Sequence, residues 1–171
     1  MNRFYRAHTI GYSRIMKPAT HRKAKWVQAF LGSDYVVLEF DQPTASAQQA
    51  ASAIGCSIAQ IAKSLVFKDI KGRAVLVIAS GANRVNTDSV AQVIGSSIER
   101  PGADFVKQQT GFSIGGIPPV GHTRPLKTVL DQDLQNFPEI WAAAGTPNAV
   151  FKLTPQQLQE LTQGPYAAIS A

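Results

Sequence analysis

Ser64-Leu65-Val66-Phe67-Lys68-Asp69-Ile70-Lys71-Gly72-Arg73-Ala74-Val75-Leu76-Val77-Ile78-Ala79 is the segment around which the rest of this chain can be arranged. Residues 64–68 are predicted to form a strand. Residues 74–79 are apolar without a break, which is typical of a central strand. The intervening residues 69–72 are expected to form a hairpin loop that turns at Lys71-Gly72. The segment therefore predicts two neighbouring strands at the middle of a sheet.

Helices and further strands are expected on both sides of this hairpin. Strands are predicted at residues 35–40, 128–130, 139–143 and 149–153. Helices are predicted from a Thr20 cap to Leu31, from Thr44 or Ser46 to Gly55, over 57–62, from a Thr87 cap to Gly95, from Pro101 to Thr110, and from Thr154-Pro155 onward. The first of them has Trp26, Val27 and Phe30 on one face. Because strands and helices do not alternate strictly, we expect a mixed α/β (α+β) domain around one curved sheet.

Composition limits the class of protein. The chain has 171 residues, of which 44% are hydrophobic and 16% charged, so one globular domain with a real core is expected. Cys56 is the only cysteine, which excludes an intramolecular disulfide and a multi-cysteine zinc site. No apolar stretch reaches about 18 residues, the length that a membrane span needs. A cytoplasmic protein without a membrane partner is therefore expected.

Positive charge is concentrated at the beginning of the chain. The net charge is +6, but residues 26–171 hold 10 basic and 11 acidic residues and are nearly neutral. We expect residues 1–19 to be a basic arm ahead of a domain at 20–171. Such an arm could be dispensable and disordered. The arm could attract phosphates, could be a targeting segment, or could precede a true start at Met16. The seven early cations are Arg3, Arg6, Arg14, Lys17, Arg22, Lys23 and Lys25.

A glycine- and proline-rich run, Gly115-Gly116-Ile117-Pro118-Pro119-Val120-Gly121-His122, is the clearest candidate for a functional loop. Glycine lets the backbone approach a ligand, whereas proline fixes φ and removes a donor. Such a loop is stiff and exposes main-chain groups with few side chains in the way, which is typical of binding loops. The alternative is a tight turn between two strands, with or without a cis X-Pro bond.

Generic catalytic motifs are missing from the sequence. It contains no phosphate-binding P-loop, no G-x-G-x-x-G and no H-E-x-x-H, and no nucleophile elbow. Its three histidines, His8, His21 and His122, are far apart along the chain, so no metal site is expected. Neither a cofactor nor a covalent enzyme intermediate is predicted.

A few isolated side chains could still carry chemistry. Lys63 stands where a helix meets an apolar strand, and its ammonium could bind a phosphate or a carbonyl, or simply extend to water. Asn83 and Arg84 could bind a sugar or phosphate, or could cap the next helix. His122 could be an acid or base or a hydrogen-bonded structural residue. Cys56 could be a reactive thiol or a small buried side chain.

Five segments that occur in one order resemble the YbaK/ProX family, the free-standing relatives of the editing domain of bacterial prolyl-tRNA synthetases. The resemblance extends from about Thr20 to the C-terminus and leaves the arm without a counterpart. Several separated matches are more specific than a glycine- and proline-rich loop alone. The matching segments are 44–51, 61–67, 77–85, 110–122 and 139–145.

The resemblance implies hydrolysis of the ester between a wrong amino acid and the 3′-terminal adenosine of a tRNA. It also implies a single curved mixed β-sheet flanked by helices. Lys63 would hold the terminal phosphate or adenosine, and the G-x-x-x-P loop at 115–119 would lie against the ester. Gly115 and Gly116 would supply amides for the oxyanion, completing the catalytic set. The expected substrate-binding residues are Ser80, Gly81, Asn83, Arg84, Ile117, Pro118, Pro119 and His122.

The amino acid that would be removed stays open. Some relatives place a histidine in the segment that matches residues 145–150, where this chain has Thr146-Pro147-Asn148. Alanine, serine, threonine and cysteine all suit a small pocket, whose walls could include Phe112, Ile114, Ile117 and Val120 unless these are core residues. The expected partner is the aminoacylated 3′ end of tRNA, with a synthetase as a further candidate; the need for a 2′-hydroxyl would exclude DNA.

Two other functions are compatible with the same residues. One is a non-catalytic module that holds a tRNA end or a nucleotide, and the other is a partner of a synthetase that uses the basic arm to bind tRNA. The editing hypothesis makes one spatial demand. The ammonium of Lys63 and the main chain of residues 115–119 must face each other across a single crevice.

Overall fold

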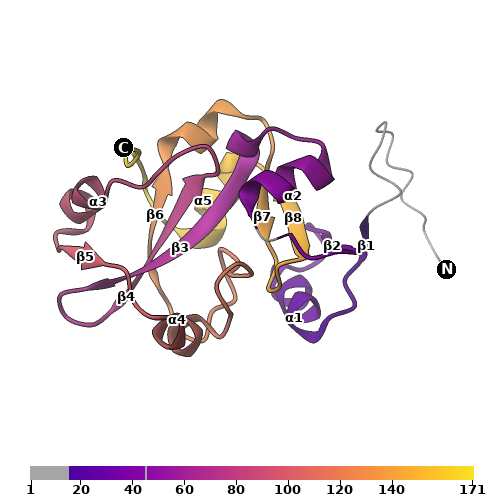
Figure 1. Cartoon of the computed structure of the whole chain (residues 1–171), viewed down its shortest axis with the longest axis horizontal. Helices are drawn as coiled ribbons and strands as arrows, with labels where there is room; N and C mark the ends of the chain where they lie inside the picture. The colour runs from indigo at the N-terminus through magenta and orange to yellow at the C-terminus, as the bar shows by residue number, and fades with distance from the viewer. Residues whose placement is uncertain (1–15, 45) are drawn as a thin grey trace.

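The fold is built on one mixed β-sheet, seen in a computed structural model that describes residues 16–44 and 46–171 (Figure 1). The strand order is β1-β2-β8-β7-β3-β4-β6-β9, and β5 pairs with β3 off this path. Three pairs, β3–β7, β4–β6 and β6–β9, are parallel, and the others are antiparallel. The predicted mixed architecture is therefore confirmed. The strands are β1 (Met16–Pro18), β2 (Val37–Phe40), β3 (Ile61–Asp69), β4 (Ala74–Ser80), β5 (Ile98–Glu99), β6 (Lys127–Asp131), β7 (Ile140–Ala143), β8 (Ala149–Leu153) and β9 (Tyr166–Ala167).

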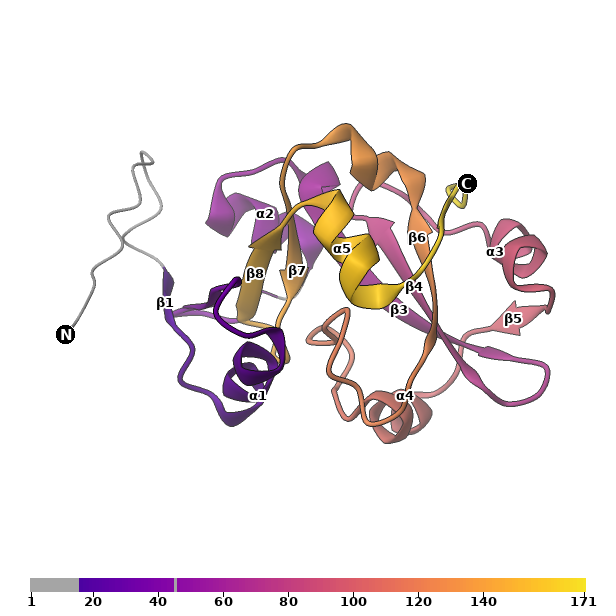
Figure 2. The same cartoon turned by 180° about the vertical axis from the view of Figure 1, so that it is seen from behind.

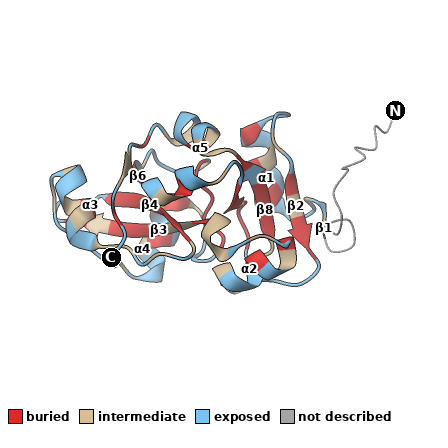
Figure 3. Ribbon diagram, turned by 90° about the horizontal axis from the view of Figure 1, so that it is seen from above, coloured by how far each residue is buried: buried red, intermediate tan, exposed pale blue. Residues whose placement is uncertain are grey.

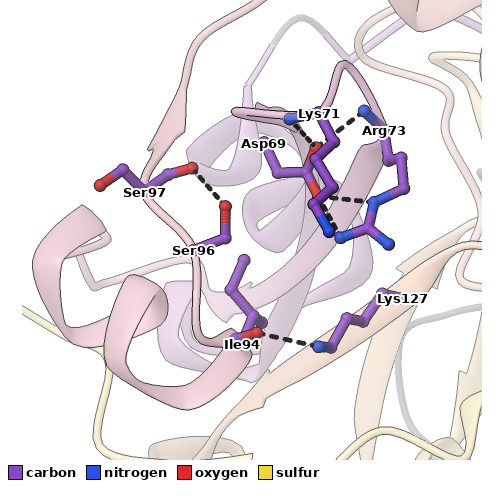
Figure 4. Close-up of polar contacts among 7 residues, drawn as sticks. All are labelled: Asp69, Lys71, Arg73, Ile94, Ser96, Ser97 and Lys127. Carbon is purple, nitrogen blue, oxygen red and sulfur yellow. Dashed lines mark hydrogen bonds and ion pairs between the residues drawn. The ribbon is translucent and has the colours of Figure 1, made fainter.

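The predicted hairpin lies at the centre of this sheet. Strands β3 and β4 pair from Ala62↔Ser80 to Lys68↔Ala74, and every residue of β4 is buried. Asp69 organises the turn, because its carboxylate accepts hydrogen bonds from the amides of Lys71 and Arg73, each 2.9 Å long, and from the Arg73 side chain (Figure 4). The same view shows Lys127 Nζ donating to Ile94 O at 3.0 Å, which ties β6 to the end of the neighbouring helix.

Within residues 16–44 and 46–171, five α-helices cover the two faces of the sheet: α1 (Arg22–Leu31), α2 (Ala47–Ile54), α3 (Thr87–Ile94), α4 (Ala103–Thr110) and α5 (Pro155–Thr162). Helices α1, α4 and α5 pack on one face and contribute to the largest core (Figure 2). Helices α2 and α3 pack on the other face, over two smaller clusters. Buried positions accordingly follow the strands between the two helical layers (Figure 3). In the part of the chain that is described, no helix combines the length and apolar character needed to cross a membrane.

Some local expectations need correction. His21, not Thr20, caps α1, because its Nδ1 accepts from Lys23 N at 3.1 Å. Asn86, not Thr87, caps α3, with its side chain accepting from the amides of residues 88 and 89. The helix expected over 57–62 is a short 3-10 turn, Ile58–Gln60, because residues 61 and 62 already belong to β3. Ser46 and Thr154 cap α2 and α5 as predicted.

The apolar face of α1 differs from the predicted one. Ala24, Val27 and Leu31 point into the core, whereas Trp26 and Phe30 are 59% and 56% exposed. Helical spacing shows which side chains share a face but not which face the rest of the chain covers. The two large aromatic side chains of α1 therefore lie at the surface.

The last residues of the segment expected to be an arm belong to the sheet. Residues 16–18 form β1 and pair with β2, with Met16 opposite Phe40 and Pro18 opposite Leu38. Glu39 of β2 then holds the entry to α1, accepting from Thr20 N, Thr20 Oγ1 and His21 N at 2.9, 2.7 and 2.8 Å. The remainder of the predicted arm, residues 1–15, lies outside the described part of the chain.

Strand pairing leaves an opening between β3 and β7. These strands pair only at Ile61↔Trp141 and Ala62↔Ala142, and β3 next gains a partner on that edge at Lys68, opposite Glu99 of β5. No described strand pairs with this edge of β3 between residues 63 and 67. The sheet is therefore split beside the most central hairpin, and the glycine- and proline-rich loop approaches the split.

Candidate functional site

A cavity of about 210 Å³ occupies the split in the sheet. Lys63, Ser64 and Leu65 of β3 form one side, and Trp141, Ala142 and Ala143 of β7 form another. The remaining walls come from the start of α2 and from two loops, and include Thr44, Ala47, Ile114, Gly115, Ile117, Thr146 and Pro147. We refer to this cavity as the β3–β7 pocket. It brings together Lys63, Gly115 and Ile117, three of the residues singled out from the sequence.

The edge of β3 that borders the pocket carries free main-chain groups. Ile61 O accepts from Gly81 N and Asp69 N donates to Arg73 O, so the odd-numbered residues of β3 face β4. Main-chain groups alternate in direction along a strand, so those of Ser64 and Val66 face the split. Ser64 Oγ is buried without a hydrogen-bond partner, the only such side-chain atom among the described residues. Buried polar groups usually have partners, so this stretch is unusual.

Lys63 is the one titratable residue among the described residues that line the pocket. Its Nζ donates to Asn83 O at 2.5 Å. Burial lowers the pKa of Lys63, Asp131 partly opposes this by favouring the ammonium, and Arg100 lowers it further. An ammonium has three donors. Two of them are left for a ligand after the bond to Asn83, and partial burial makes such bonds stronger than they would be in water.

A carboxylate that the sequence analysis did not single out supports this lysine. Asp131 Oδ2 accepts from Asn83 Nδ2 at 2.8 Å and from Ser80 N at 3.0 Å. Asn83 Nδ2 also donates to Asp133 at 2.8 Å. Asp131 thereby fixes the loop whose carbonyl holds Lys63. Its signal in the sequence is an Asp-x-Asp pair that begins at the last residue of β6.

The other residues expected from this loop do not line the β3–β7 pocket. Ser80 is buried and its Oγ donates to Ala59 O at 2.7 Å. Gly81 packs against Ile58 so closely that an added Cβ would lie 2.4 Å from Ile58 O. Arg84 is exposed, and its carbonyl accepts from Ala171 N. Neither these residues nor Asn83 lines the pocket; Ser80 and Asn83 are bound by Asp131 and so help to hold Lys63 from behind.

The glycine- and proline-rich loop is closed at its base and anchored near its tip. Thr123 N donates to Thr110 O at 3.0 Å, which brings the two ends together. Near the tip, Gly116 N donates to Ser113 O at 3.1 Å and Gly116 O accepts from Gly145 N at 2.9 Å. The loop contains no cis peptide bond, so the cis X-Pro alternative does not apply. Main-chain hydrogen bonds within the loop and to Gly145 therefore hold the tip in place.

The two glycines predicted to bind an oxyanion have different environments. Gly116 is buried, and an added Cβ would lie 2.8 to 2.9 Å from main-chain atoms of Thr146. Its amide and carbonyl are both used within the fold, so it serves to dock the loop. Gly115 is exposed at the pocket with φ +94°, and its amide forms no hydrogen bond with any described residue. Gly115 is therefore the better-placed main-chain donor.

The residues of the loop beyond Ile117 do not line this pocket. Pro118 and Pro119 are buried and do not line it. His122 Nε2 lies 2.6 Å from Pro118 O, and because a carbonyl only accepts, this nitrogen carries the proton. Burial lowers the pKa of His122, while the bond to Pro118 partly opposes that effect. His122 lines a different cavity, next to α1. Phe112 and Val120 belong to the core, whereas Ile114 reaches the β3–β7 pocket.

The segment 146–148, where some relatives have a histidine, contributes neutral groups to the pocket. Thr146 and Pro147 line it, and Thr44 Oγ1 donates to Pro147 O at 2.7 Å. Thr146 Oγ1 donates to Asn148 Oδ1 at 2.9 Å, and Asn148 Nδ2 donates to Phe40 O at 3.2 Å. These bonds join the pocket wall to β2 without placing an acid or base in it.

Neither the thiol of Cys56 nor a cluster of metal-ligating side chains is found in the described part of the β3–β7 pocket. Cys56 is half-buried, does not line the pocket, and burial raises the pKa of its thiol. A raised pKa makes the thiolate scarcer at neutral pH, which suits the structural interpretation. Across residues 16–44 and 46–171, no group of three or more His, Cys, Asp or Glu side chains is arranged to hold a metal ion.

Comparison with known proteins identifies the family. Residues 41–161 match the model of the aminoacyl-tRNA editing domain. The chain therefore belongs to this family, and the resemblance to YbaK/ProX proteins is confirmed. A Bacillus subtilis protein, "Uncharacterized protein YwhH", is 33% identical over 126 residues, covering 74% of this chain and 80% of its own length.

Two further relatives carry more specific names. An Enterococcus faecalis protein named "Putative Cys-tRNA(Pro)/Cys-tRNA(Cys) deacylase EbsC" is 26% identical over 126 residues, covering 73% of this chain and 77% of its own length. A solved structure described as "a putative trans-editing enzyme for prolyl tRNA synthetase" is 40% identical with a TM-score of 0.85, covering 90% of this chain and 99% of that one. The present chain thus shares its fold with this solved structure.

Proposed function

We propose that this protein hydrolyses the ester that links a small, wrongly attached amino acid to the 3′ end of a tRNA, in the cytoplasm where tRNA is charged. One observation carries the proposal. Lys63 and the free amide of Gly115 line the same cavity, at a place where the sheet is split. Membership of the editing family supports the reaction class. The editing names of two relatives point in the same direction.

The chemical groups of the pocket suit an activated ester. The Lys63 ammonium binds the terminal phosphate or the ribose, while Gly115 N–H donates to the ester carbonyl oxygen and stabilises the oxyanion. The oxygen of a bound water forms a bond to the carbonyl carbon, and the bond from that carbon to the ribose oxygen breaks. The ribose oxygen takes up a proton that the water gives up. No lining residue in the described part is a side-chain base, so orientation and the adjacent ribose hydroxyl supply the assistance.

The free edge of β3 is suited to the amino-acid part of the substrate. A free amino acid ester carries an ammonium group, and the Ser64 carbonyl on the open edge of β3 can accept a hydrogen bond from it. Ala47, Ala142 and Ala143 with Trp141 give an apolar surround. A cavity of about 210 Å³ favours small side chains such as those of alanine, serine, cysteine and threonine. Size selection of this kind complements synthetases, which separate small apolar side chains by only about 10- to 200-fold.

The direct test is a deacylation screen on a panel of tRNAs charged with small amino acids. We expect hydrolysis of at least one of them, and a fall of about 100-fold or more for Lys63→Ala, because a preorganised charged donor is lost. Lys68→Ala is the matched control: it changes a lysine of the same strand that pairs with Glu99 outside the pocket. Wild-type protein that binds the charged tRNAs but hydrolyses none of them would instead identify a non-catalytic module.

A further inference from the structure

Helix α1 presents two aromatic side chains that the core does not use. Trp26 and Phe30 are four residues apart, so they share one face, and both are more than half exposed. Both lie against Gly121, where an added Cβ would be 3.5 Å from Trp26 Nε1 and 3.7 Å from Phe30 Cγ. Trp26 Nε1 also donates to Gly121 O at 3.2 Å. The Trp26 ring is therefore fixed in position while much of it remains open to solvent.

Helix α1 and the end of the loop also carry cations without acidic partners. Arg22 and Lys25 are exposed on α1, and Arg124 is exposed two residues beyond His122. The half-buried Lys23 donates its Nζ to Gly111 O and lies 5.2 Å from the centre of the Phe112 ring. Within the described residues none of these four cations forms an ion pair, whereas Lys17, Lys68, Arg73 and Lys152 do. Helix α1 contains no acidic residue.

A cavity of about 340 Å³ lies between this face of α1 and the base of the glycine- and proline-rich loop. Arg22, Lys23 and Trp26 line it from α1, and Gly111, Phe112 and His122 line it from the loop. No described carboxylate lines it. We call these residues, together with Phe30, the α1 surface. Unpaired cations beside an open aromatic ring suit a ligand that is both anionic and planar.

The α1 surface and the β3–β7 pocket share one loop. Gly111 lines the cavity at α1, and Gly115 lines the pocket. They are four positions apart along the chain, so their Cα atoms are at most about 14 Å apart. Helices α1 and α4, which flank the loop, lie on the same side of the molecule in Figures 1 and 2. A chain-like ligand whose end occupies the pocket can therefore continue along the loop onto the α1 surface.

We propose that the α1 surface binds single-stranded RNA, namely the nucleotides that precede the terminal adenosine of the substrate. This inference rests on the proposed function. A base stacks on Trp26, and phosphates lie near Arg22 and Lys23. Proteins that hold single strands combine aromatic platforms with a positive groove in this way, and such stacking tolerates different base sequences. The ends of tRNAs are single-stranded, so this mode of binding fits them.

The test is a titration of the full chain with a short single-stranded RNA that ends in CCA, followed by fluorescence polarisation at two salt concentrations. We expect Trp26→Leu to weaken binding about tenfold or more. Arg22→Gln should weaken binding and reduce the slope of log K against log salt by about 0.7, the value for one phosphate on a single strand. Lys71→Gln, at the exposed turn between β3 and β4, is the matched control and should bind like the wild type.

Three results would overturn the proposal. The first is equal RNA affinity for wild type, Trp26→Leu and Arg22→Gln, with folding verified by circular dichroism. Phe30→Ala, compared with Ile70→Ala at the exposed hairpin turn, repeats the test should Trp26→Leu fail to fold. The second is adenosine monophosphate binding as tightly as the RNA, which would indicate a free nucleotide as ligand. The third is self-association in gel filtration that Trp26→Leu abolishes, which would indicate an interface between copies.

The proposed function has a separate readout. An adenosine esterified at its 3′-oxygen with alanine, serine, threonine or cysteine fills the β3–β7 pocket but has no preceding nucleotides to reach α1. Failure of the wild-type protein to hydrolyse any of these esters counts against the deacylase proposal. Hydrolysis of the esters combined with RNA binding that ignores Trp26 and Arg22 counts only against the α1 surface.

Discussion

Single residues in this protein divide between holding the fold and facing the pocket. Lys63 and Gly115 face the pocket, whereas Gly116 is used entirely by the fold. Neighbouring glycines in one motif thus have different physical roles. One leaves an amide free, and the other lets the loop dock on the main chain of Thr146 with no room for a side chain.

Gly116→Ala tests this division. The added Cβ would meet Thr146 main-chain atoms at 2.8 to 2.9 Å, so either the loop or residues 145–146 must move. We expect a loss of about 1–3 kcal/mol in the free energy of unfolding, as for overpacking elsewhere. Urea unfolding measures it, with Ser113→Ala at an exposed position of the same loop as control. Unchanged stability together with lost hydrolysis would restore Gly116 to the catalytic set.

At the scale of secondary-structure elements, the ends of strands position the residues of the site. The loop after β4 and the end of β6 meet at Asp131, which orders Ser80 and Asn83 and thereby the carbonyl that holds Lys63. The pocket itself exists because β3 and β7 pair over only two residues. The geometry of the pocket therefore depends on how the central strands separate and on a carboxylate that does not line the pocket.

Asp131→Asn should reveal this coupling in the pH dependence of hydrolysis. Asp131 favours the charged form of Lys63, so its neutralisation lowers a Lys63 pKa that burial already holds below 10.5. If the ammonium binds substrate, activity falls as pH rises through that pKa. The fall should come at lower pH in Asp131→Asn than in the wild type. Single-turnover rates across the alkaline range measure it, and an identical alkaline limb would show that Asp131 is only structural.

Sequence patterns predicted the elements that are long or clearly capped. The unbroken apolar run identified β4, and Ser46 and Thr154 correctly marked the starts of two helices. The strands β1, β5 and β9 are not predicted, because two or three residues are too few to show an alternation of apolar and polar side chains.

The site was predictable only where local sequence carries the signal. The position of Lys63 between a predicted helix and a strand, and the glycine- and proline-rich run that holds Gly115, single out two residues that line the pocket. The support of Lys63 was not found, because Asn83 and Asp131 are 48 residues apart and only the fold brings them together. The exposure of Trp26 could not be predicted either, because a helical pattern does not show which face of the helix the rest of the chain covers.

On the scale of the whole molecule, the centre and one edge of the sheet have different roles. The central strands and the loop form the pocket, while β1, β2 and the entry to α1 close the sheet at one edge (Figure 1). Glu39 joins these edge elements, because a single buried carboxylate accepts three hydrogen bonds from residues 20 and 21. The α1 surface depends on this junction for its position.

Glu39 should make the fold sensitive to acid. Burial raises the pKa of Glu39, but the hydrogen bonds from His21 and Thr20, with the charge of Lys17, outweigh it and lower the pKa below 4.5. A carboxyl group with a lowered pKa stabilises the fold above its ordinary pKa, and this contribution is lost as pH falls through the folded-state value. Glu39→Gln should therefore be less stable than the wild type at pH 7, and the difference should shrink with acidification. Denaturant unfolding from pH 7 downward measures it, and a difference independent of pH would contradict this role.

The most direct measurement is a crystal structure with a non-hydrolysable analogue, 3′-alanylamino-3′-deoxyadenosine, whose amide replaces the ester. Lys63 and Gly115 are expected to hold opposite parts of it. Its carbonyl oxygen should lie within hydrogen-bond distance of Gly115 N, its nucleoside should lie beside Lys63 Nζ, and its ammonium should meet the open edge of β3 at Ser64. An analogue bound elsewhere, or bound in the pocket with its carbonyl turned away from Gly115, would contradict the account.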